Sequence, residues 1–296
     1  MAGKLRQRTG LWGDLFILPF FVGFIIFSLY PIIYSFMLSF KTWDGFRPMS
    51  DAGMGNWKRL FTDGNILLSL FNTLVIWLVD FIPQIFVALL LAMIFSQMKI
   101  RGMKVFRMIY YLPNLITAAS MGLLFNLLFD GRNSTFNQIL VALGAGGAPY
   151  DFFDSAIFTR LISSYILWWM WFGYTTIILM AGISSIDPEL YEAAYIDGAG
   201  KLQVFMKITM PLIKETMIYL TITSIIGGMQ IFDVPANLTN VYGDPQKAIL
   251  TSSMYIYVQA FKNFSFGYAS AASVLQFIII AVLSFTTLRF MQRGRK

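Results

Sequence analysis

The sequence predicts an all-α, polytopic membrane protein with six transmembrane helices, organised as a single membrane domain over residues 1–296. Hydrophobic residues make up 57% of the chain and charged residues only 12%, whereas a soluble domain usually carries about 25% charged residues. Six stretches approach or exceed the roughly 20 apolar residues with which a helix crosses a bilayer. Lysine and arginine gather on one side of these stretches. These observations together favour a membrane-embedded helical bundle.

The predicted spans follow the apolar stretches in chain order. The first could be a signal peptide, because basic residues precede it, but it is longer than a signal-peptide core and lacks an A-x-A cleavage site. The second belongs to an apolar run from residue 66 that exceeds one crossing, which predicts a tilted helix. Prolines inside the spans predict kinks that neighbouring helices can accommodate. The spans are 15–39, 70–95, 106–129, 157–183, 212–234 and 266–288, and the prolines are Pro19, Pro31, Pro83 and Pro113.

The positions of lysine and arginine predict the orientation, because these residues are enriched in cytoplasmic segments. With both termini in the cytoplasm, segments near 40–65, 130–156 and 235–265 lie outside, and most of the 22 basic residues lie inside. This placement accounts for the net charge of +7 without a nucleic-acid partner. The residues counted as cytoplasmic are Lys4, Arg6, Arg8, Lys99, Arg101, Lys104, Arg107, Lys201, Lys207, Lys214, Arg289, Arg293, Arg295 and Lys296.

The composition disfavours an enzyme. The chain contains no cysteine and no histidine, so it lacks thiolates and disulfides as well as the commonest general base and metal ligand. No span contains a cluster of carboxylates that could replace them. We therefore expect no catalytic residues and no metal site.

The segment 184–211 interrupts the apolar pattern between the fourth and fifth spans. Asp187 is a favourable N-cap and Pro188 suits the first helical position, while Gly198 can adopt the positive φ that ends a helix. A second helical run, KLQVFMKITMP, leads to Pro211 at the membrane entry. A plain connector needs neither a cap nor a defined end, and most connectors are shorter. The pattern favours a short helix that docks on another surface.

The letters GAGKL at 198–202 resemble the end of a phosphate-binding loop. That motif needs a glycine five residues before Gly200 and serine or threonine after Lys201. The chain has Tyr195 and Leu202 at these positions. We therefore expect this chain to bind no nucleotide.

The same segment resembles the EAA signature of binding-protein-dependent ABC importer permeases, which reads E-A-A, three residues, G, nine residues, I-x-L-P. The spacing is kept, and Met210 replaces the usual leucine. The resemblance implies the type I importer permease fold, in which this segment is a coupling helix that fits a cleft on a separate cytoplasmic ATPase. It assigns this coupling role to Glu192, Ala193, Ala194, Gly198, Ile208 and Pro211.

The resemblance extends over nearly the whole chain. Stretches such as FILPFFVGFIIFSLYPIIYSF and IFDVPANLTN are similar to the carbohydrate-uptake permeases that handle maltose-like sugars and glycerol phosphate. This implies sugar uptake across a bacterial or archaeal cell membrane. The implied partners are a homologous second permease, two ATPase subunits and an extracytoplasmic sugar-binding protein. ATP and magnesium would act at the ATPase, with no cofactor on this chain.

Two spans carry candidate residues for a substrate pathway. The fourth span is rich in aromatic side chains. They could be ordinary anchors at a bilayer interface, or they could line a pathway, because several of them fall near the middle of the predicted span. Sugars have apolar C–H faces and hydroxyls, so aromatic rings with a few amides suit them. By the resemblance, several of these positions line the sugar pocket of maltose-type permeases: Met170, Trp171, Tyr174, Ser224, Gly227 and Gly228. Trp168, Gln230 and Asn114 complete the candidate set.

Asp80 is the one clear charge within a predicted span, with Gln84 one turn later. It could be a structural hydrogen-bonding residue, or the coupling site of an ion-driven secondary transporter. Secondary transporters usually show inverted repeats, and none is visible in this sequence. Ion-coupled transport through Asp80 is therefore kept as the alternative function.

Overall fold

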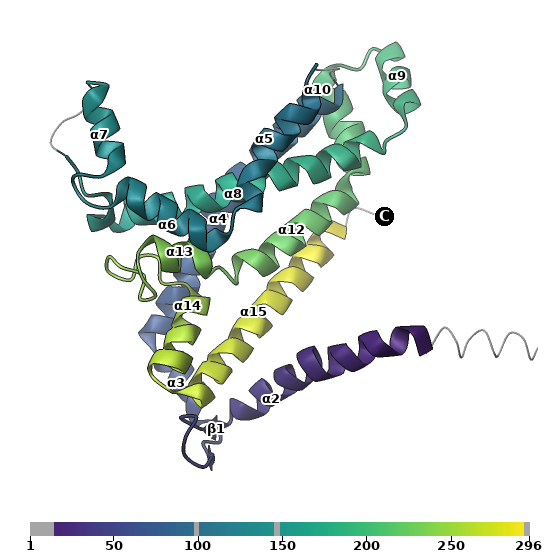
Figure 1. Cartoon of the computed structure of the whole chain (residues 1–296). Coiled ribbons are helices and arrows are strands. Elements are labelled where there is room, and N and C mark those ends of the chain that lie inside the picture. Colours follow the sequence, from purple (N-terminus) through teal and green to yellow (C-terminus); the bar gives the residue numbers. More distant parts are fainter. Residues whose placement is uncertain (1–14, 98–100, 145–148, 293–296) are drawn as a thin grey trace, which may run out of the picture. The chain divides into compact units, whose positions relative to one another are not determined.

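The computed structural model describes residues 15–97, 101–144 and 149–292. The chain divides into two compact units, Met1–Asp63 with Gln259–Leu275 and Gly64–Val258 with Gln276–Lys296, and the single membrane domain expected from the sequence stays a prediction. Both are built almost entirely from helices, which are labelled in Figure 1.

The first unit contains a long apolar helix and a short hairpin. The helix covers Leu15–Leu38 and includes a π-helical turn, η1 (Ile25–Leu29), followed by α2 (Tyr30–Leu38). The antiparallel strands β1 (Lys41–Thr42) and β2 (Ser50–Asp51) come next. They are followed by α3 (Gly55–Thr62) and, later in the chain, by most of η4 (Val258–Lys262) and the first residues of α15 (Phe266–Gln292).

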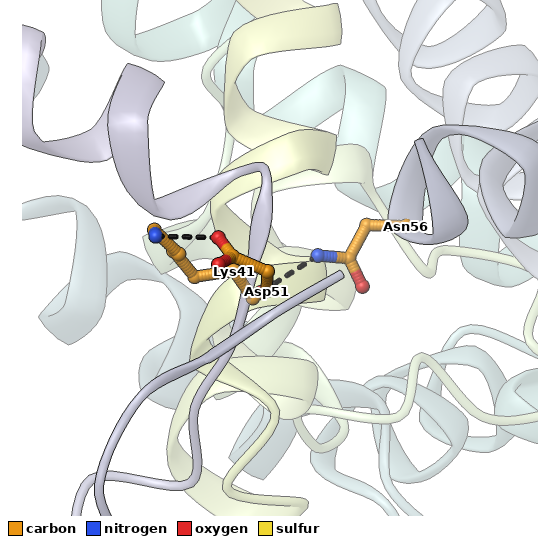
Figure 2. Close-up of polar contacts among 3 residues, drawn as sticks. All are labelled: Lys41, Asp51 and Asn56. Carbon is orange, nitrogen blue, oxygen red and sulfur yellow. Dashed lines mark hydrogen bonds and ion pairs between the residues drawn. The ribbon is translucent and has the colours of Figure 1, made fainter. Parts of the chain in front are cut away.

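Polar contacts fix the hairpin of the first unit. Lys41 forms an ion pair with Asp51 across the two strands (Figure 2). Asn56 Nδ2 donates hydrogen bonds to the carbonyl oxygens of Ser39 and Lys41, both at 2.9 Å. Because a two-stranded ribbon alone is barely stable in water, these contacts explain why the turn after α2 is ordered.

The second unit is organised around two long helices, α4 (Gly64–Gln97) and α8 (Ala156–Ser184). Ala88 and Ala92 of α4 are completely buried against Leu179 and Met180 of α8. Small residues let helix backbones approach closely within a membrane. The remaining elements are α5 (Met103–Leu115), α6 (Ala118–Phe129), α7 (Thr135–Ala142), η2 (Phe152–Asp154), α9 (Pro188–Ile196), α10 (Lys201–Val204), η3 (Phe205–Thr209), α11 (Met210–Leu212), α12 (Lys214–Gly228), α13 (Asp233–Leu238), α14 (Ser252–Tyr257) and the rest of α15.

Four of the predicted spans form helices that are long and apolar enough to cross a membrane. Within the described part of the chain these helices are Leu15–Leu38, Gly64–Ser96, Ala156–Ser184 and Phe266–Gln292. They correspond to the first, second, fourth and sixth predicted spans. Pro83 lies inside α4 without ending it.

The third predicted span, 106–129, is not one continuous helix. It is split into α5 and α6, which meet at an angle of 90°. Ile116 and Thr117 have extended backbones at the break. Thr117 then caps α6, because its side chain accepts a hydrogen bond from the Ser120 N–H at 3.3 Å. The pair forms either a broken span or a re-entrant loop.

The fifth predicted span, 212–234, is only partly one helix. The main helix there is α12, which has 15 residues and ends at Gly228. Glycine is a poor helix former, and the pair Gly227–Gly228 comes directly before the turn that leads into α13. With four long helices and one bent pair in the described residues, the count of six crossings remains a prediction.

A buried amide fastens the segment before α14 to the core of the second unit. Asn72 of α4 is completely buried. Its Nδ2 donates to the carbonyl oxygens of Lys247 and Leu250 at 2.7 and 3.2 Å. Arg160 of α8 donates to Asn72 Oδ1 at 3.0 Å and to the Ala248 carbonyl at 2.8 Å. One side chain thus joins two long helices to a loop.

Replacing Asn72 with alanine is expected to destabilise the protein by about 2–3 kcal/mol, because buried hydrogen-bonding groups lose their partner. Thermal unfolding of the detergent-solubilised protein measures the change. Asn65→Ala is the matched control, since Asn65 accepts a hydrogen bond from Lys247 at an exposed site, and we expect it to cost under about 0.5 kcal/mol. Equal effects of the two substitutions would contradict the assigned role of Asn72.

Candidate functional site

The helix α9 (Pro188–Ile196) begins and ends as its sequence predicts. The Asp187 side chain accepts a hydrogen bond from the Glu189 N–H at 3.0 Å, and Pro188 occupies the first turn. At the other end Gly198 has a φ of +77°, and the Ala199 N–H donates to the Ala194 carbonyl at 2.9 Å. Figure 1 shows α9 as a separate short helix beyond the end of α8. The expected short helix with a glycine stop is confirmed.

The surface around α9 is unusually apolar for a connecting segment. Ile196 is 85% exposed and Leu202 is 75% exposed, and Leu190 and Met206 are exposed as well. Exposed large apolar side chains in one segment make that segment a candidate for an interaction surface.

The residues of the EAA signature spread over two parts of this segment. Glu192, Ala193 and Gly198 are exposed, whereas Ala194 is half-buried. A Cβ on Gly198 would meet nothing within 4 Å, so this chain needs glycine there for its backbone conformation and not for internal packing. Ile208 and Pro211 lie further along, on η3 and α11.

The segment that contains α9 contacts the helical run that follows it. The hydroxyls of Tyr191 on α9 and Thr209 on η3 are 3.3 Å apart. From Lys201 onward, α10, η3, α11 and α12 follow one another almost without interruption, with Ile213 between the last two. The sequence thus runs from α9 to α12 through short helical segments, with one side-chain contact back to α9.

A cavity of about 430 Å³ lies at the other end of α12. Its walls come from α4, α8, α12, the turn after α12 and the first residues of α6 and α13. Polar, aromatic and small residues all contribute, among them Trp77, Asp80, Gln84, Leu167, Trp171, Tyr174, Thr175, Thr223, Ser224, Gly227, Gly228, Gln230, Phe232 and Asp233.

The structure brings together six of the nine residues proposed for a substrate pathway: Trp171, Tyr174, Ser224, Gly227, Gly228 and Gln230. The other three are not among the lining residues. Met170 is 5% exposed and packs in the core. Trp168 stacks on Phe172 at a centroid distance of 5.1 Å. Asn114 belongs to α5, a helix that does not line the cavity.

The sequence reasoning did not assign the wall formed by α4 to the substrate pathway. Trp77, Asp80 and Gln84 line the cavity, and their spacing of three and four residues places them on one face of the helix. Trp77 Nε1 donates to Ser224 Oγ at 2.9 Å, and Gln84 Nε2 donates to Thr175 Oγ1 at 2.6 Å. The sequence signal that could have identified this wall is the presence of polar residues at helical spacing within an apolar run.

The two glycines at the end of α12 play different roles. A Cβ on Gly228 would overlap the Trp77 indole, so glycine there allows α12 and α4 to pack closely. A Cβ on Gly227 would meet nothing within 4 Å. Gly227 therefore leaves space in the cavity, while Gly228 leaves space for the Trp77 side chain, which forms part of the cavity wall.

Known proteins resemble the chain along most of its length. It matches the family described as binding-protein-dependent transport system inner membrane component over residues 65–294. It is 34% identical over 283 residues to the lactose transport system permease protein LacF of Rhizobium radiobacter, covering 95% of this chain and 94% of the relative. It is 30% identical over 302 residues to the trehalose/maltose transport system permease protein MalF of Thermococcus litoralis, covering 100% and 97%.

A solved structure shares the fold. A chain of a bacterial ABC transporter involved in importing the acidic polysaccharide alginate superposes with a TM-score of 0.83 at 23% identity, covering 100% of this chain and 99% of that chain. At this identity the likeness shows the fold alone. The chain therefore belongs to the binding-protein-dependent transport system inner membrane components, which makes it a transmembrane permease subunit of an ABC importer and not an enzyme.

Proposed function

We propose that this permease forms part of the passage for a sugar or oligosaccharide, and that α9 couples the passage to a separate ATPase. The observation that carries the proposal is the connection between the two sites: α12 forms one wall of the cavity, and the helical run leading into it starts just after α9. Work done on α9 can therefore reshape the cavity.

The chemistry of the cavity supports a sugar as cargo. Trp171 and Tyr174 provide aromatic surface, with ring centroids 5.8 Å apart in an edge-on arrangement. Gln84 and Gln230 provide amides, and Ser224 provides a hydroxyl. A binding site for a polyhydroxylated ligand combines such apolar surfaces with a few directed polar groups. The lactose and trehalose/maltose permeases named above support the same class of cargo.

The proposed cycle assigns a task to each partner. Two ATPase subunits close on ATP and magnesium and draw the docked α9 helices of this permease and a homologous second permease together. The cavity then opens outward and receives sugar from an extracytoplasmic binding protein, and hydrolysis returns it to the inward-open state. This arrangement requires both termini and α9 on the cytoplasmic side of a bacterial or archaeal cell membrane.

Ion-driven transport through Asp80 is the other candidate, because Asp80 is buried at the cavity wall. Membership in a family of ABC importer components favours ATP as the energy source. The burial of Asp80 thus needs a different explanation.

Co-purification tests the docking of α9. The tagged permease is co-expressed with its partner subunits and solubilised in mild detergent. We expect an ATPase to co-elute with the wild type and about ten-fold less to co-elute with Glu192→Ala and Gly198→Asp, because central interface residues each contribute strongly to binding.

Gly200→Asp is the matched control for Gly198→Asp. It adds the same charge two residues away, where φ is −71° and aspartate is a favourable N-cap for α10. We expect wild-type co-elution of the ATPase. If the Glu192 and Gly198 variants insert in the membrane and retain the ATPase as well as the control does, α9 is not the coupling helix.

A further inference from the structure

Building on the proposed function, we propose that Asp80 contacts the transported saccharide directly and restricts the cavity to saccharides without acidic groups. Its carboxylate accepts hydrogen bonds from hydroxyl or ammonium groups of the cargo and excludes uronate or phosphate groups.

Asp80 differs from the other polar residues of its wall. Trp77 and Gln84, on the same face of α4, donate hydrogen bonds to Ser224 and Thr175. Asp80 is 6% exposed, and its Oδ1 is buried without a hydrogen-bond partner in the described part of the chain. A buried carboxylate that served only to join helices would have a partner on a neighbouring helix. Asp80 instead belongs to the lining of a cavity that can hold a ligand.

The charged residues that line the cavity within the described part of the chain are all acidic. Its charged lining residues are Asp80 and Asp233, and no lysine or arginine lines it among the residues that the structure describes. Arg160 lies elsewhere and is held by Asn72 and the Ala248 carbonyl. An anionic saccharide would place its charge beside a buried carboxylate with no cation to compensate, which is strongly unfavourable. A neutral or amino sugar supplies the hydrogen-bond donors that Asp80 lacks.

Asp80 also differs in its freedom to bind the cargo, because the residues on either side of it on α4 are held by contacts within the protein. Trp77 is fixed by its bond to Ser224 and by stacking on Phe81 at a centroid distance of 5.4 Å. Gln84 is fixed by Thr175. These contacts hold the wall on both sides of Asp80, which lines the cavity from the same face of α4. A preorganised acceptor of this kind confers selectivity at little entropic cost.

Saturation-transfer NMR on the assembled importer, purified and held in lipid nanodiscs without its binding protein, tests the inference. The probes are lactose as a neutral disaccharide, diglucosamine as a cationic one and digalacturonate as an anionic one. In the wild type we expect lactose and diglucosamine to bind and digalacturonate to bind at least about ten-fold more weakly. Asp80→Asn is expected to weaken diglucosamine binding about ten-fold or more, because hydrogen bonds to a charged group are stronger than those between neutral groups. The same substitution is expected to reduce the difference in affinity between lactose and digalacturonate.

Two further variants distinguish a direct contact between Asp80 and the saccharide from a general effect of negative charge, and a control shows that each variant is folded and assembled. Asp130→Asn removes one negative charge from an exposed residue outside the cavity lining, and we expect binding within two-fold of wild type. Asp80→Glu keeps the charge and is expected to keep the exclusion of digalacturonate. Co-elution of the ATPase confirms that each variant is assembled.

The outcomes distinguish this inference from the proposed function. If the wild type binds lactose or diglucosamine and Asp80→Asn leaves all three affinities unchanged, Asp80 is not a contact residue, although the cavity remains a sugar site. Preferential binding of digalacturonate by the wild type would also overturn the inference. If no saccharide binds the wild-type importer, both the sugar site and the role of Asp80 are wrong.

Discussion

Replacing Gly227 with tryptophan is expected to abolish sugar uptake while the importer stays assembled. A Cβ at this position meets nothing within 4 Å, and Gly227 lines the cavity of about 430 Å³, so we expect the indole to occupy part of the cavity. Tryptophan presents some of the largest side-chain surface of any residue, and the space left is too small for a disaccharide. Uptake of the sugar bound by the partner binding protein, measured in proteoliposomes with ATP inside, should fall to background.

Ile226→Trp is the matched control for this experiment. Ile226 is the preceding residue of α12, is 41% exposed and is not among the residues that line the cavity. We expect uptake within two-fold of wild type. Normal uptake by Gly227→Trp would mean that sugar does not pass through this cavity, whereas loss of uptake in both variants would point to damage to α12 itself.

Substituting Gly228 with alanine is expected to cost about 3 kcal/mol of stability. The new Cβ would overlap the Trp77 indole, and overpacking of this kind typically costs about 1–3 kcal/mol. Trp77 cannot move aside freely, because it donates a hydrogen bond to Ser224 and stacks on Phe81. If it does move, the lost hydrogen bond adds about 1 kcal/mol. The measurement is thermal unfolding of the solubilised protein.

Two comparisons make this prediction specific. Gly227→Ala introduces the same methyl group one residue earlier, in open space, and we expect a change below about 0.5 kcal/mol. Adding Trp77→Leu to Gly228→Ala should recover part of the loss, because the two residues are in contact and their effects are not additive. A loss in Gly228→Ala that Trp77→Leu leaves unchanged would rule out the proposed overlap.

The local signals in the sequence predicted the long helices and the capped helix well. The fourth span was predicted as 157–183, and α8 covers Ala156–Ser184. The cap at Asp187 and the stop at Gly198 were predicted because both depend on residues within one or two turns. A hydropathy pattern also identifies the apolar stretch around Pro113, but it does not show that the chain bends after Ile116, since the residues on both sides of the bend are equally apolar.

The cavity was harder to predict because hydropathy contains no information about rotation. Met170 and Trp171 are neighbours in sequence, yet the first packs in the core and the second lines the cavity. Successive residues point about 100° apart around a helix, so their roles depend on which helices pack on α8. The contribution of Trp77 likewise depends on the approach of Gly228, which is remote in sequence.

The π-helical turn η3 (Phe205–Thr209) lies between α9 and the cavity wall. A π turn accommodates one more residue than an α-helical turn. It therefore changes the direction in which the side chains of the following helical residues point around the helix axis. Removing a single residue from η3 would turn the side chains of α12 by about 100° relative to α9. Gly227 and Ser224 would then no longer face the cavity, although their identity and the length of α12 were unchanged. The number of residues in this turn therefore determines which side chains of α12 line the cavity.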